Sequence, residues 1–294
     1  MEHYTPTPIT GHTALICLLG SPCAHSISPM MHNASFEALG LDYRYLAFDV
    51  NEATLPTAVA GLKALGARGF NLTMPDKNLM VSLCDDLSTA ARIIGAVNTV
   101  VNENGRLIGH NTDGIGYMQS VKDAGYDIID KKMTLLGAGG AATAILVQAA
   151  LDGLKEISVF VRPTSRFYDR LVHTVDELTK ITDCKIKICD FSDAELLKQE
   201  LADSAILTNG TSVGMAPHED TCPVPEDLVF PDGLIVSDII YNPRETRLLS
   251  MAKHQGNPFF NGSYMLLYQG AEAFRLWTGK EMPVEQIKRD FFSK

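Results

Sequence analysis

The sequence has few cysteines and no long apolar run. Its six cysteines form no C-x-x-C pair and its eight histidines form no H-E-x-x-H or similar cluster, so we expect reduced structural thiols and no metal site. No apolar run reaches the ~20 residues that a membrane span needs. Residues 1–11 also lack the basic region and apolar core of a signal peptide, so we expect a soluble, cytoplasmic protein.

The chain has fewer basic than acidic residues. The chain carries 25 Lys and Arg against 35 Asp and Glu, a net charge of -10. An acidic surface repels phosphates and anionic lipids, so neither nucleic acid nor a membrane is expected as a partner. A small anionic substrate would then have to be held by local donors. Nothing in the pattern distinguishes a monomer from a homodimer.

The first part of the chain alternates between predicted strands and helices. A chain of 294 residues favours two domains over one. Apolar or β-branched runs predict strands at 14–20, 43–50 and 69–73, with helices at 28–39 and 55–65 between them. This β-α-β-α-β order predicts a parallel sheet. Ser28 is expected to cap its helix, with Pro29 in the first helical position.

A second α/β unit is predicted after residue 125. Strands are expected at 133–136, 157–161, 185–188, 205–209 and 234–238, with helices at 143–151 and 169–181. Two further helical patterns, at 264–277 and 284–292, end the chain.

A glycine turn lies between the first strand and the first helix of this second unit. Its residues fit G-x-G-x-x-G/A and stand in the strand–turn–helix context that a dinucleotide site requires. The first glycine permits the tight turn, the second lets the backbone approach a pyrophosphate, and the free N–H groups of the helix favour phosphate. The expected pyrophosphate loop is Gly137, Ala138, Gly139, Gly140 and Ala141, followed by the small Ala142.

The end of the next strand leaves the choice of cofactor open. A unit that prefers NAD usually has an acid there, and this sequence has none in Val161-Arg162-Pro163-Thr164-Ser165-Arg166. Two arginines could bind the extra phosphate of NADP. Arg162 could equally stack on the adenine, which would suit either cofactor.

Polar side chains recur in the first half where strands end or helices begin. They lie at 26–29, at 71–77, and at 98–99 with 111–114. The ends of parallel strands converge on one crevice, so these groups could face a ligand with several hydroxyls and a negative charge. Taken singly, each has a plain structural explanation: a helix cap at Ser28, a turn at 98–99 and a turn dipeptide at 113–114.

Together these segments resemble the shikimate dehydrogenase family from end to end. The wording of M-P-D-K and of Y-Q-G-A-E-A-F, with Tyr45, is closer to the quinate/shikimate branch. The matching motifs, in order, are H-S-I-S-P-M-M-H-N (25–33), N-L-T-M-P-D-K (71–77), G-A-V-N-T (95–99), G-H-N-T-D-G (109–114), G-A-G-G-A (137–141), Y-N-P (241–243) and Y-Q-G-A-E-A-F (268–274).

The resemblance implies a fold and a reaction. It implies an N-terminal α/β substrate domain with a mainly parallel sheet at 1–117, completed by helices at 262–294, and a Rossmann-type dinucleotide-binding domain at 118–261. It implies NAD(P)-dependent, reversible oxidation of shikimate to 3-dehydroshikimate, on the route to chorismate and the aromatic amino acids. A quinate dehydrogenase using NAD, or an enzyme with both activities, stays open. A non-catalytic ligand sensor is less expected, because no spare segment could bind DNA.

The resemblance also assigns residues. Lys77 and Asp113 form the catalytic pair, with Lys77 as acid/base and Asp113 either sharing the proton transfer or only orienting Lys77. The implied substrate contacts are Ser26, Ser28, Asn71, Thr73, Lys77, Asn98, Asp113, Tyr241 and Gln269. The implied cofactor contacts outside the glycine turn are Val161, Arg162, Thr164, Arg166, Ile239, Tyr241, Tyr264 and Met265.

Two departures from the family pattern fall on cofactor contacts. After the second strand of the dinucleotide unit, Val161 replaces the usual asparagine and Pro163 intervenes. Tyr264 stands where a glycine before the methionine is usual. These departures keep the choice between NAD and NADP open.

Overall fold

The computed structural model describes residues 8–292, so most of the segment expected to lack a signal peptide lies outside the described residues. The chain forms two compact units. Of the described residues, the first unit combines 8–112 with 269–292, and the second comprises 113–268. Both units are built from helices and strands, as the α/β prediction requires.

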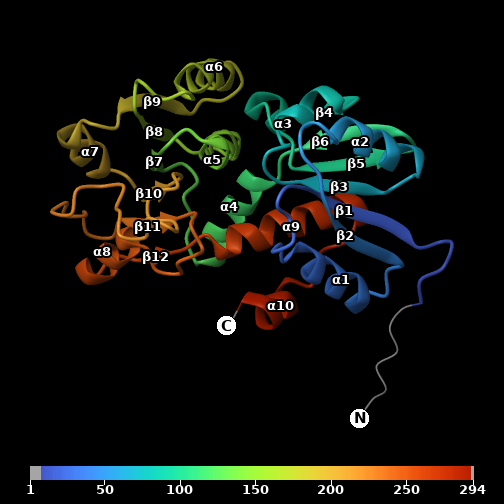
Figure 1. Cartoon of the computed structure of the whole chain (residues 1–294). Helices are drawn as coiled ribbons and strands as arrows, with labels where there is room; N and C mark the ends of the chain where they lie inside the picture. Colours follow the sequence, from blue (N-terminus) through green and yellow to red (C-terminus); the bar gives the residue numbers. More distant parts are fainter. Residues whose placement is uncertain (1–7, 293–294) are drawn as a thin grey trace, which may run out of the picture. The chain divides into compact units, whose positions relative to one another are not determined.

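The first half of the first unit follows the predicted order (Figure 1). Strands β1 (Ala14–Gly20), β2 (Tyr43–Asp49) and β3 (Gly69–Leu72) are mutually parallel where they pair, with β1 in the centre. Helices α1 (Ser28–Ala38) and α2 (Leu55–Ala64) connect them. The β-α-β-α-β prediction is therefore confirmed.

The other half of this sheet contains antiparallel strands that the sequence pattern did not predict. Strand β5 (Thr99–Glu103) pairs antiparallel with both β3 and β6 (Arg106–His110). The turn of the β5–β6 hairpin is Asn104-Gly105, with φ of 53° and 90°, the backbone that this dipeptide favours. The sheet order is β2-β1-β3-β5-β6-β4. The remaining elements are a 3-10 helix (Leu79–Leu83), β4 (Asp86–Leu87) and α3 (Thr89–Ile94).

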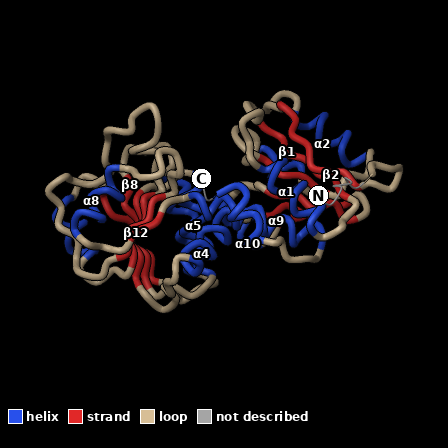
Figure 2. Tube along the Cα trace, turned by 90° about the horizontal axis from the view of Figure 1, so that it is seen from below, coloured by secondary structure: helices blue, strands red, loops and turns tan. Residues whose placement is uncertain are grey.

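Helices cover both faces of this sheet (Figure 2). Leu55, Val59 and Leu62 of α2 bury their side chains in one apolar cluster with strand residues. On the other face lie α1 and the second half of α9 (Ser263–Thr278), followed by α10 (Val284–Ile287). The indole N–H of Trp277 in α9 donates to Val100 O at 2.9 Å. Any Cβ at position 69 would lie 2.4 Å from the Trp277 Nε1 atom, so glycine is required there.

The second unit is a six-stranded, all-parallel sheet. Its order, β12-β11-β10-β7-β8-β9, is that of a Rossmann fold read from its last strand. This arrangement confirms the predicted dinucleotide-type architecture. The strands are β7 (Lys132–Leu136), β8 (Glu156–Val161), β9 (Lys185–Asp190), β10 (Ile206–Asn209), β11 (Ile235–Asp238) and β12 (Phe259–Phe260).

The helices of the second unit lie on both faces of its sheet (Figures 1 and 2). Helices α7 (Ala194–Leu201) and α8 (Arg247–Gln255) share one apolar cluster with strand residues such as Leu207 and Val236. The opposite face is covered by α4 (Asp113–Asp123), α5 (Gly140–Leu151) and α6 (Tyr168–Thr179).

The boundary between the units falls between Thr112 and Asp113, five residues before the position expected from the sequence. The whole of α4 belongs to the second unit because it packs closely on α5. A Cβ at Gly114 would lie 2.3 Å from Ala144 O. The second crossing, between Tyr268 and Gln269, lies inside the continuous helix α9 rather than before it.

Over residues 8–292, no helix has the length and apolar character to cross a membrane. The same residues contain no group of three or more His, Cys, Asp or Glu side chains placed to hold a metal ion. All six cysteines are free thiols.

Candidate active site

The turn after β3 places Thr73 and Lys77. The Thr73 N–H donates to Leu19 O at 2.9 Å, and the Ser21 N–H donates to Met74 O at 3.0 Å, which ties the turn to the end of β1. At its far end, the Val97 N–H donates to Lys77 O at 2.9 Å. The Lys77 backbone is thus fixed from two sides, while its side chain is half-buried.

Ser26 and Ser28 lie at the start of α1, although not as the sequence predicted. The N-cap is Ile27, and Ser28 is the first helical residue with no capping side-chain bond. The expectation that Ser28 caps the helix is therefore wrong. Instead Ser26 Oγ accepts from the Ser28 N–H at 3.2 Å, a local serine turn that leads into the helix. Both hydroxyls stand where free helical N–H groups favour an anion.

Helix α1 is tied to strand β2 through Asn33. Its amide donates to Tyr45 O at 2.8 Å, and its Oδ1 accepts from the Tyr45 N–H at 2.9 Å. These bonds occupy backbone groups of the edge strand and fix the helix that carries the two serines.

Tyr45 connects that helix start to Asn71. Its ring is fully buried, and its hydroxyl donates to Asn71 Oδ1 at 2.7 Å. Burial raises the pKa of the Tyr45 phenol well above its usual value, while a hydrogen bond with Ser28 opposes that rise. The phenol therefore remains a protonated donor between Ser28 and Asn71.

Asn98 is the centre of a buried polar network beside β3 and β5. Asn71 donates to Asn98 O at 3.0 Å and to Thr99 Oγ1 at 2.9 Å. Asn98 Oδ1 accepts from the Thr99 hydroxyl at 3.0 Å and from the Thr112 N–H at 2.8 Å. The Asn98 amide donates to Thr112 Oγ1 at 3.0 Å and reaches Gln269 Oε1 at 3.5 Å.

This network brings together Asn71, Asn98 and Gln269, three of the seven substrate contacts predicted within the first unit, and Tyr45 links Ser28 to it. Asn98 does not form the turn considered as its structural explanation, because it pairs with the sheet through the His110 carbonyl. Asp113 is likewise not a turn residue: it is the first residue of α4 and follows the anchored Thr112 directly.

In the second unit, the glycine turn has the geometry that a pyrophosphate needs. Gly137 has a φ of 99°, which only glycine adopts readily, and its N–H donates to Phe160 O at 2.8 Å. A Cβ at Gly139 or Gly140 would meet nothing within 4 Å, so open space faces the start of α5. A Cβ at Gly210 would lie 2.7 Å from the Ala142 Cβ, which explains the small residue after the turn.

The segment after β8 presents cations and no acid. Arg162, Thr164 and Arg166 are exposed, and the Arg166 guanidinium lies 4.7 Å above the Phe167 ring. Asp190 pairs in register with Val161 on the neighbouring strand. Its carboxylate is already bound by the Ser192 N–H at 2.9 Å and the Ser192 hydroxyl at 2.8 Å.

The other predicted cofactor contacts follow β11 or open α9. Ile239 is half-buried and Tyr241 is 50% exposed, both just after β11. Tyr264 is half-buried and Met265 is buried in the first turn of α9. All four belong to the second unit, with the glycine turn.

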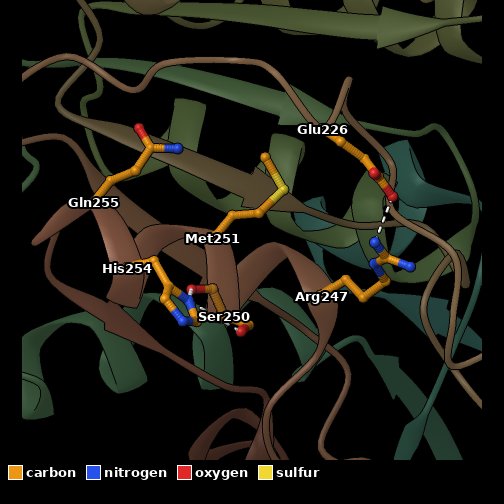
Figure 3. Close-up of a pocket in the computed structure, with 6 residues that line it drawn as sticks. All are labelled: Glu226, Arg247, Ser250, Met251, His254 and Gln255. Carbon is orange, nitrogen blue, oxygen red and sulfur yellow. Dashed lines mark hydrogen bonds and ion pairs between the residues drawn. The ribbon is translucent and has the colours of Figure 1, made fainter.

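Two other polar features of this unit contain no predicted site residue. A cavity of about 290 Å³ is lined by residues of α8 together with Glu226, which bonds to Arg247 (Figure 3). At the amino-terminal ends of the parallel strands, away from the glycine turn, Lys132 at the start of β7 bonds to Glu200 at 2.7 Å. Burial of Glu200 opposes its ionisation, but the hydrogen bonds from Lys132 and Ser158, together with the charges of Lys132 and Lys187, outweigh burial and lower the pKa of Glu200 to about 2.

Comparison with known proteins decides the family. A family model described as the shikimate dehydrogenase substrate binding domain matches residues 18–100, and one described as the shikimate 5'-dehydrogenase C-terminal domain matches 262–289. A shikimate dehydrogenase (NADP(+)) of Listeria monocytogenes serotype 4b (strain F2365) is 53% identical over 285 residues, 97% of each chain. The chain belongs to the shikimate dehydrogenase family.

Other shikimate dehydrogenase relatives agree. A quinate/shikimate dehydrogenase of Escherichia coli O139:H28 is 44% identical over 281 residues, 96% of this chain and 97% of that protein. The crystal structure of shikimate 5-dehydrogenase from Listeria monocytogenes in complex with shikimate and NAD has a TM-score of 0.92 and 52% identity. It covers 96% of this chain and 98% of that chain.

Family motifs pointed to most of the clustered residues, but some partners were not assigned from the sequence. Thr99 and Thr112 lie inside quoted motifs and complete the Asn98 network. Asn209, Thr211 and Asp238 form a further polar group at the ends of β10 and β11. Polar residues directly after buried strands were the available signal for this last group.

Proposed function

We propose that the chain catalyses the NAD(P)-dependent, reversible oxidation of shikimate to 3-dehydroshikimate, a step toward chorismate and the aromatic amino acids. The observation that carries this proposal is the Asn98 network, which gathers amide and hydroxyl groups beside the anchored Lys77 turn. Such a set suits a ring with several hydroxyls. The 53% identity to a relative named as a shikimate dehydrogenase (NADP(+)) supports the same reaction.

We propose that Ser26 and Ser28 bind the substrate carboxylate. Both stand at the start of an eleven-residue helix, where the dipole favours negative charge. The ring hydroxyls would contact Thr73, Lys77, Asn98, Asp113 and Gln269, with Asn71 close by. Tyr241 would lie near the nicotinamide and the substrate carboxylate. The net charge of -10 makes such local donors necessary, because the overall field repels an anion.

The cofactor fits the second unit. The open backbone at Gly139 and Gly140, before the N–H groups of α5, would hold the pyrophosphate together with Gly137, Ala138 and Ala141. Val161, Arg162, Thr164 and Arg166 would contact the adenosine ribose, and the two exposed arginines suit NADP as well as NAD. The nicotinamide would lie near Ile239, Tyr241, Tyr264 and Met265. When bound, it supplies the hydride acceptor in one direction and the hydride donor in the other.

Lys77 would act on the hydroxyl that is oxidised. Loss of hydride from a carbinol carbon leaves positive character there unless the hydroxyl proton also departs, so an acid/base group must stand at that oxygen. An ammonium at the same place stabilises developing alkoxide charge. Asp113 would either share the proton or hold Lys77 and the hydroxyl in line.

The two units would divide these tasks. Residues 1–117 with 262–294 would bind and activate the substrate, and residues 118–261 would bind the dinucleotide. We further propose that the enzyme works in the cytoplasm, which its six free thiols suit, as a monomer or homodimer. A quinate dehydrogenase that uses NAD is less well supported, because relatives of 53% identity are named for shikimate and NADP(+).

Product analysis tests the proposal. The purified chain is incubated with shikimate and NADP+ or NAD+, and the product is identified by mass and by its reconversion with reduced cofactor. We expect 3-dehydroshikimate and a stoichiometric amount of reduced cofactor. Binding of shikimate without turnover under either cofactor would instead support a ligand sensor.

A further inference from the structure

We infer that Asp238 is a positioning residue. Its carboxylate fixes the loop that carries Tyr241, at the nicotinamide end of the cofactor site, relative to the glycine turn at the pyrophosphate end, and we call this set of contacts the brace. The inference rests on the proposed function. Asp238 ends strand β11, and its side chain is 1% exposed. Its Oδ1 atom accepts from Asn209 Nδ2 at 3.1 Å and from the Ile240 N–H at 3.0 Å, and its Oδ2 atom accepts from the Thr246 hydroxyl at 2.8 Å.

One arm of this brace closes the nicotinamide segment. Ile240 and Thr246 flank the loop that carries Tyr241, so one carboxylate holds the loop at both of its ends. Thr246 is also the N-cap of α8, which fixes the far end to a helix. On the near side, a Cβ at Gly262 would lie 1.9 Å from Ile239 O, so the backbone that carries Ile239 is closely packed as well.

The other arm reaches the glycine turn. Asn209 Oδ1 accepts from the Thr211 N–H at 3.0 Å and from the Thr211 hydroxyl at 2.7 Å. The Thr211 methyl carbon would lie 2.7 Å from a Cβ at Gly137, the first glycine of the pyrophosphate loop. An unbroken series of contacts therefore runs from Asp238 through Asn209 and Thr211 to Gly137.

The three donors around position 238 favour an acid there. The Asn209 amide, the Ile240 N–H and the Thr246 hydroxyl all donate, and only a carboxylate offers acceptors at both of its oxygens. An asparagine has nearly the same shape but turns an N–H2 group toward one donor. If the N–H2 group faces Asn209 or the Ile240 N–H, that donor loses its buried partner. If it faces Thr246, the hydroxyl must rotate and accept instead, and in either case the bonds lose the charge of the carboxylate.

Asp238→Asn tests the brace. The dissociation constants of NADPH and NADH are measured by direct titration without shikimate. The deuterium isotope effect on kcat/KM is measured with 4-deuterated reduced cofactor. We expect cofactor binding to weaken about tenfold, the scale of one charge-assisted hydrogen bond, and the isotope effect to rise because hydride transfer becomes slower. The KM for 3-dehydroshikimate should change less than the cofactor affinity, because seven of the nine proposed substrate contacts lie in the first unit and only Tyr241 lies on the loop that Asp238 holds.

Glu200→Gln is the matched control, because Glu200 is also a buried carboxylate of the second unit but bonds to Lys132 at the opposite strand ends. It should lower the melting temperature without changing cofactor affinity or the isotope effect. If Asp238→Asn behaves like this control, Asp238 is merely structural and the inference is overturned. If Asp238→Asn fails to fold, Thr246→Val removes one donor alone. It should then weaken cofactor binding a few-fold, and unchanged affinity would overturn the inference.

The result for the wild-type chain separates the two levels of the argument. A wild-type chain that binds neither NADPH nor NADH would overturn the proposed function, and this inference with it. If the wild-type chain binds cofactor, and Asp238→Asn binds it equally tightly, only the inference about Asp238 is overturned.

Discussion

Asn98 Oδ1 accepts a hydrogen bond from the Thr112 backbone N–H at 2.8 Å, and so fixes the residue that directly precedes Asp113. The same side chain reaches Gln269 and receives the Thr99 hydroxyl. One buried amide thus joins the start of β5 to the residue before α4 and to Gln269 of α9. We expect that removing the Asn98 side chain weakens substrate binding more than does removing another buried asparagine whose loss costs the same free energy of unfolding.

Asn98→Ala should raise the KM for shikimate at least about tenfold, because several site groups lose their common partner. Asn102→Ala is the matched control. Asn102 is a buried asparagine of β5, the strand that begins directly after Asn98, and its side chain bonds only to backbone groups, Ala67 O and the Gly105 N–H, in the contacts described. Both variants should lose about 1–3 kcal/mol of unfolding free energy. Equal KM values in the two variants would show that Asn98 is structural only.

Lys77→Met should reduce kcat by several orders of magnitude while shikimate still binds and the chain still folds. The substitution keeps an unbranched apolar stem and removes the acid/base group and its charge. Lys63→Met, which removes an exposed lysine paired with Asp85, should leave kcat unchanged. Turnover of Lys77→Met near that of the wild type would remove Lys77 from the mechanism.

Arg162→Ala distinguishes the two interpretations of the segment after β8. If Arg162 binds the extra phosphate, the KM for NADP+ should rise about tenfold or more and the KM for NAD+ should stay nearly constant. Arg170→Ala, which removes an arginine of helix α6 in the same unit, serves as the control and should leave both KM values unchanged. An equal rise for both cofactors would indicate stacking on the adenine instead.

His32 should make the fold sensitive to mild acid. Its ring is fully buried, stacks on Tyr45 at 4.5 Å, and has no hydrogen-bond partner at either nitrogen. Burial lowers the pKa of His32 from 6.5 to about 3. Below pH 6.5, His32 is therefore protonated in the unfolded chain but stays neutral in the folded chain. The free energy of unfolding should then fall as the pH decreases, by about 1.4 kcal/mol per pH unit, until the pH approaches the pKa of His32 in the folded chain.

His32→Phe should remove that dependence. Urea unfolding of the wild type and the variant at pH 6.5 and pH 5 measures the difference, in which the other seven histidines cancel. We expect the wild type to lose about 2 kcal/mol more than the variant over this interval. Parallel pH dependences would mean that His32 finds a proton partner when the ring is charged.

Much of the fold was predictable because strand and helix periodicity is strong where the elements are buried. The β-α-β-α-β order and the Rossmann unit follow from apolar runs such as Ala14–Gly20 and from the glycine turn. The β5–β6 hairpin was not predicted, since the short run Thr99–Glu103 shows no alternation. Its Asn104-Gly105 turn was the usable signal.

The sequence motifs named candidate residues for the site, but they did not show the bonds that join those residues. Motifs named Asn71, Asn98 and Lys77, but sequence cannot show that Tyr45 joins Ser28 to Asn71 or that Thr112 anchors on Asn98. Such bonds join residues from separate strands and helices, and only the folded register brings them together. The expectation that Ser28 caps α1 was wrong for a related reason. The helix begins one residue earlier than expected, with Ile27 as the N-cap, and the sequence does not specify the backbone angles that decide between the two positions.

The central claim is that this chain oxidises shikimate with a nicotinamide cofactor, and the specificity constant tests it most directly. Initial rates are measured with shikimate and with quinate, each with NADP+ and with NAD+. We predict that kcat/KM is highest for shikimate with one of the two cofactors. A higher kcat/KM for quinate with NAD+ than for shikimate with either cofactor would contradict the account.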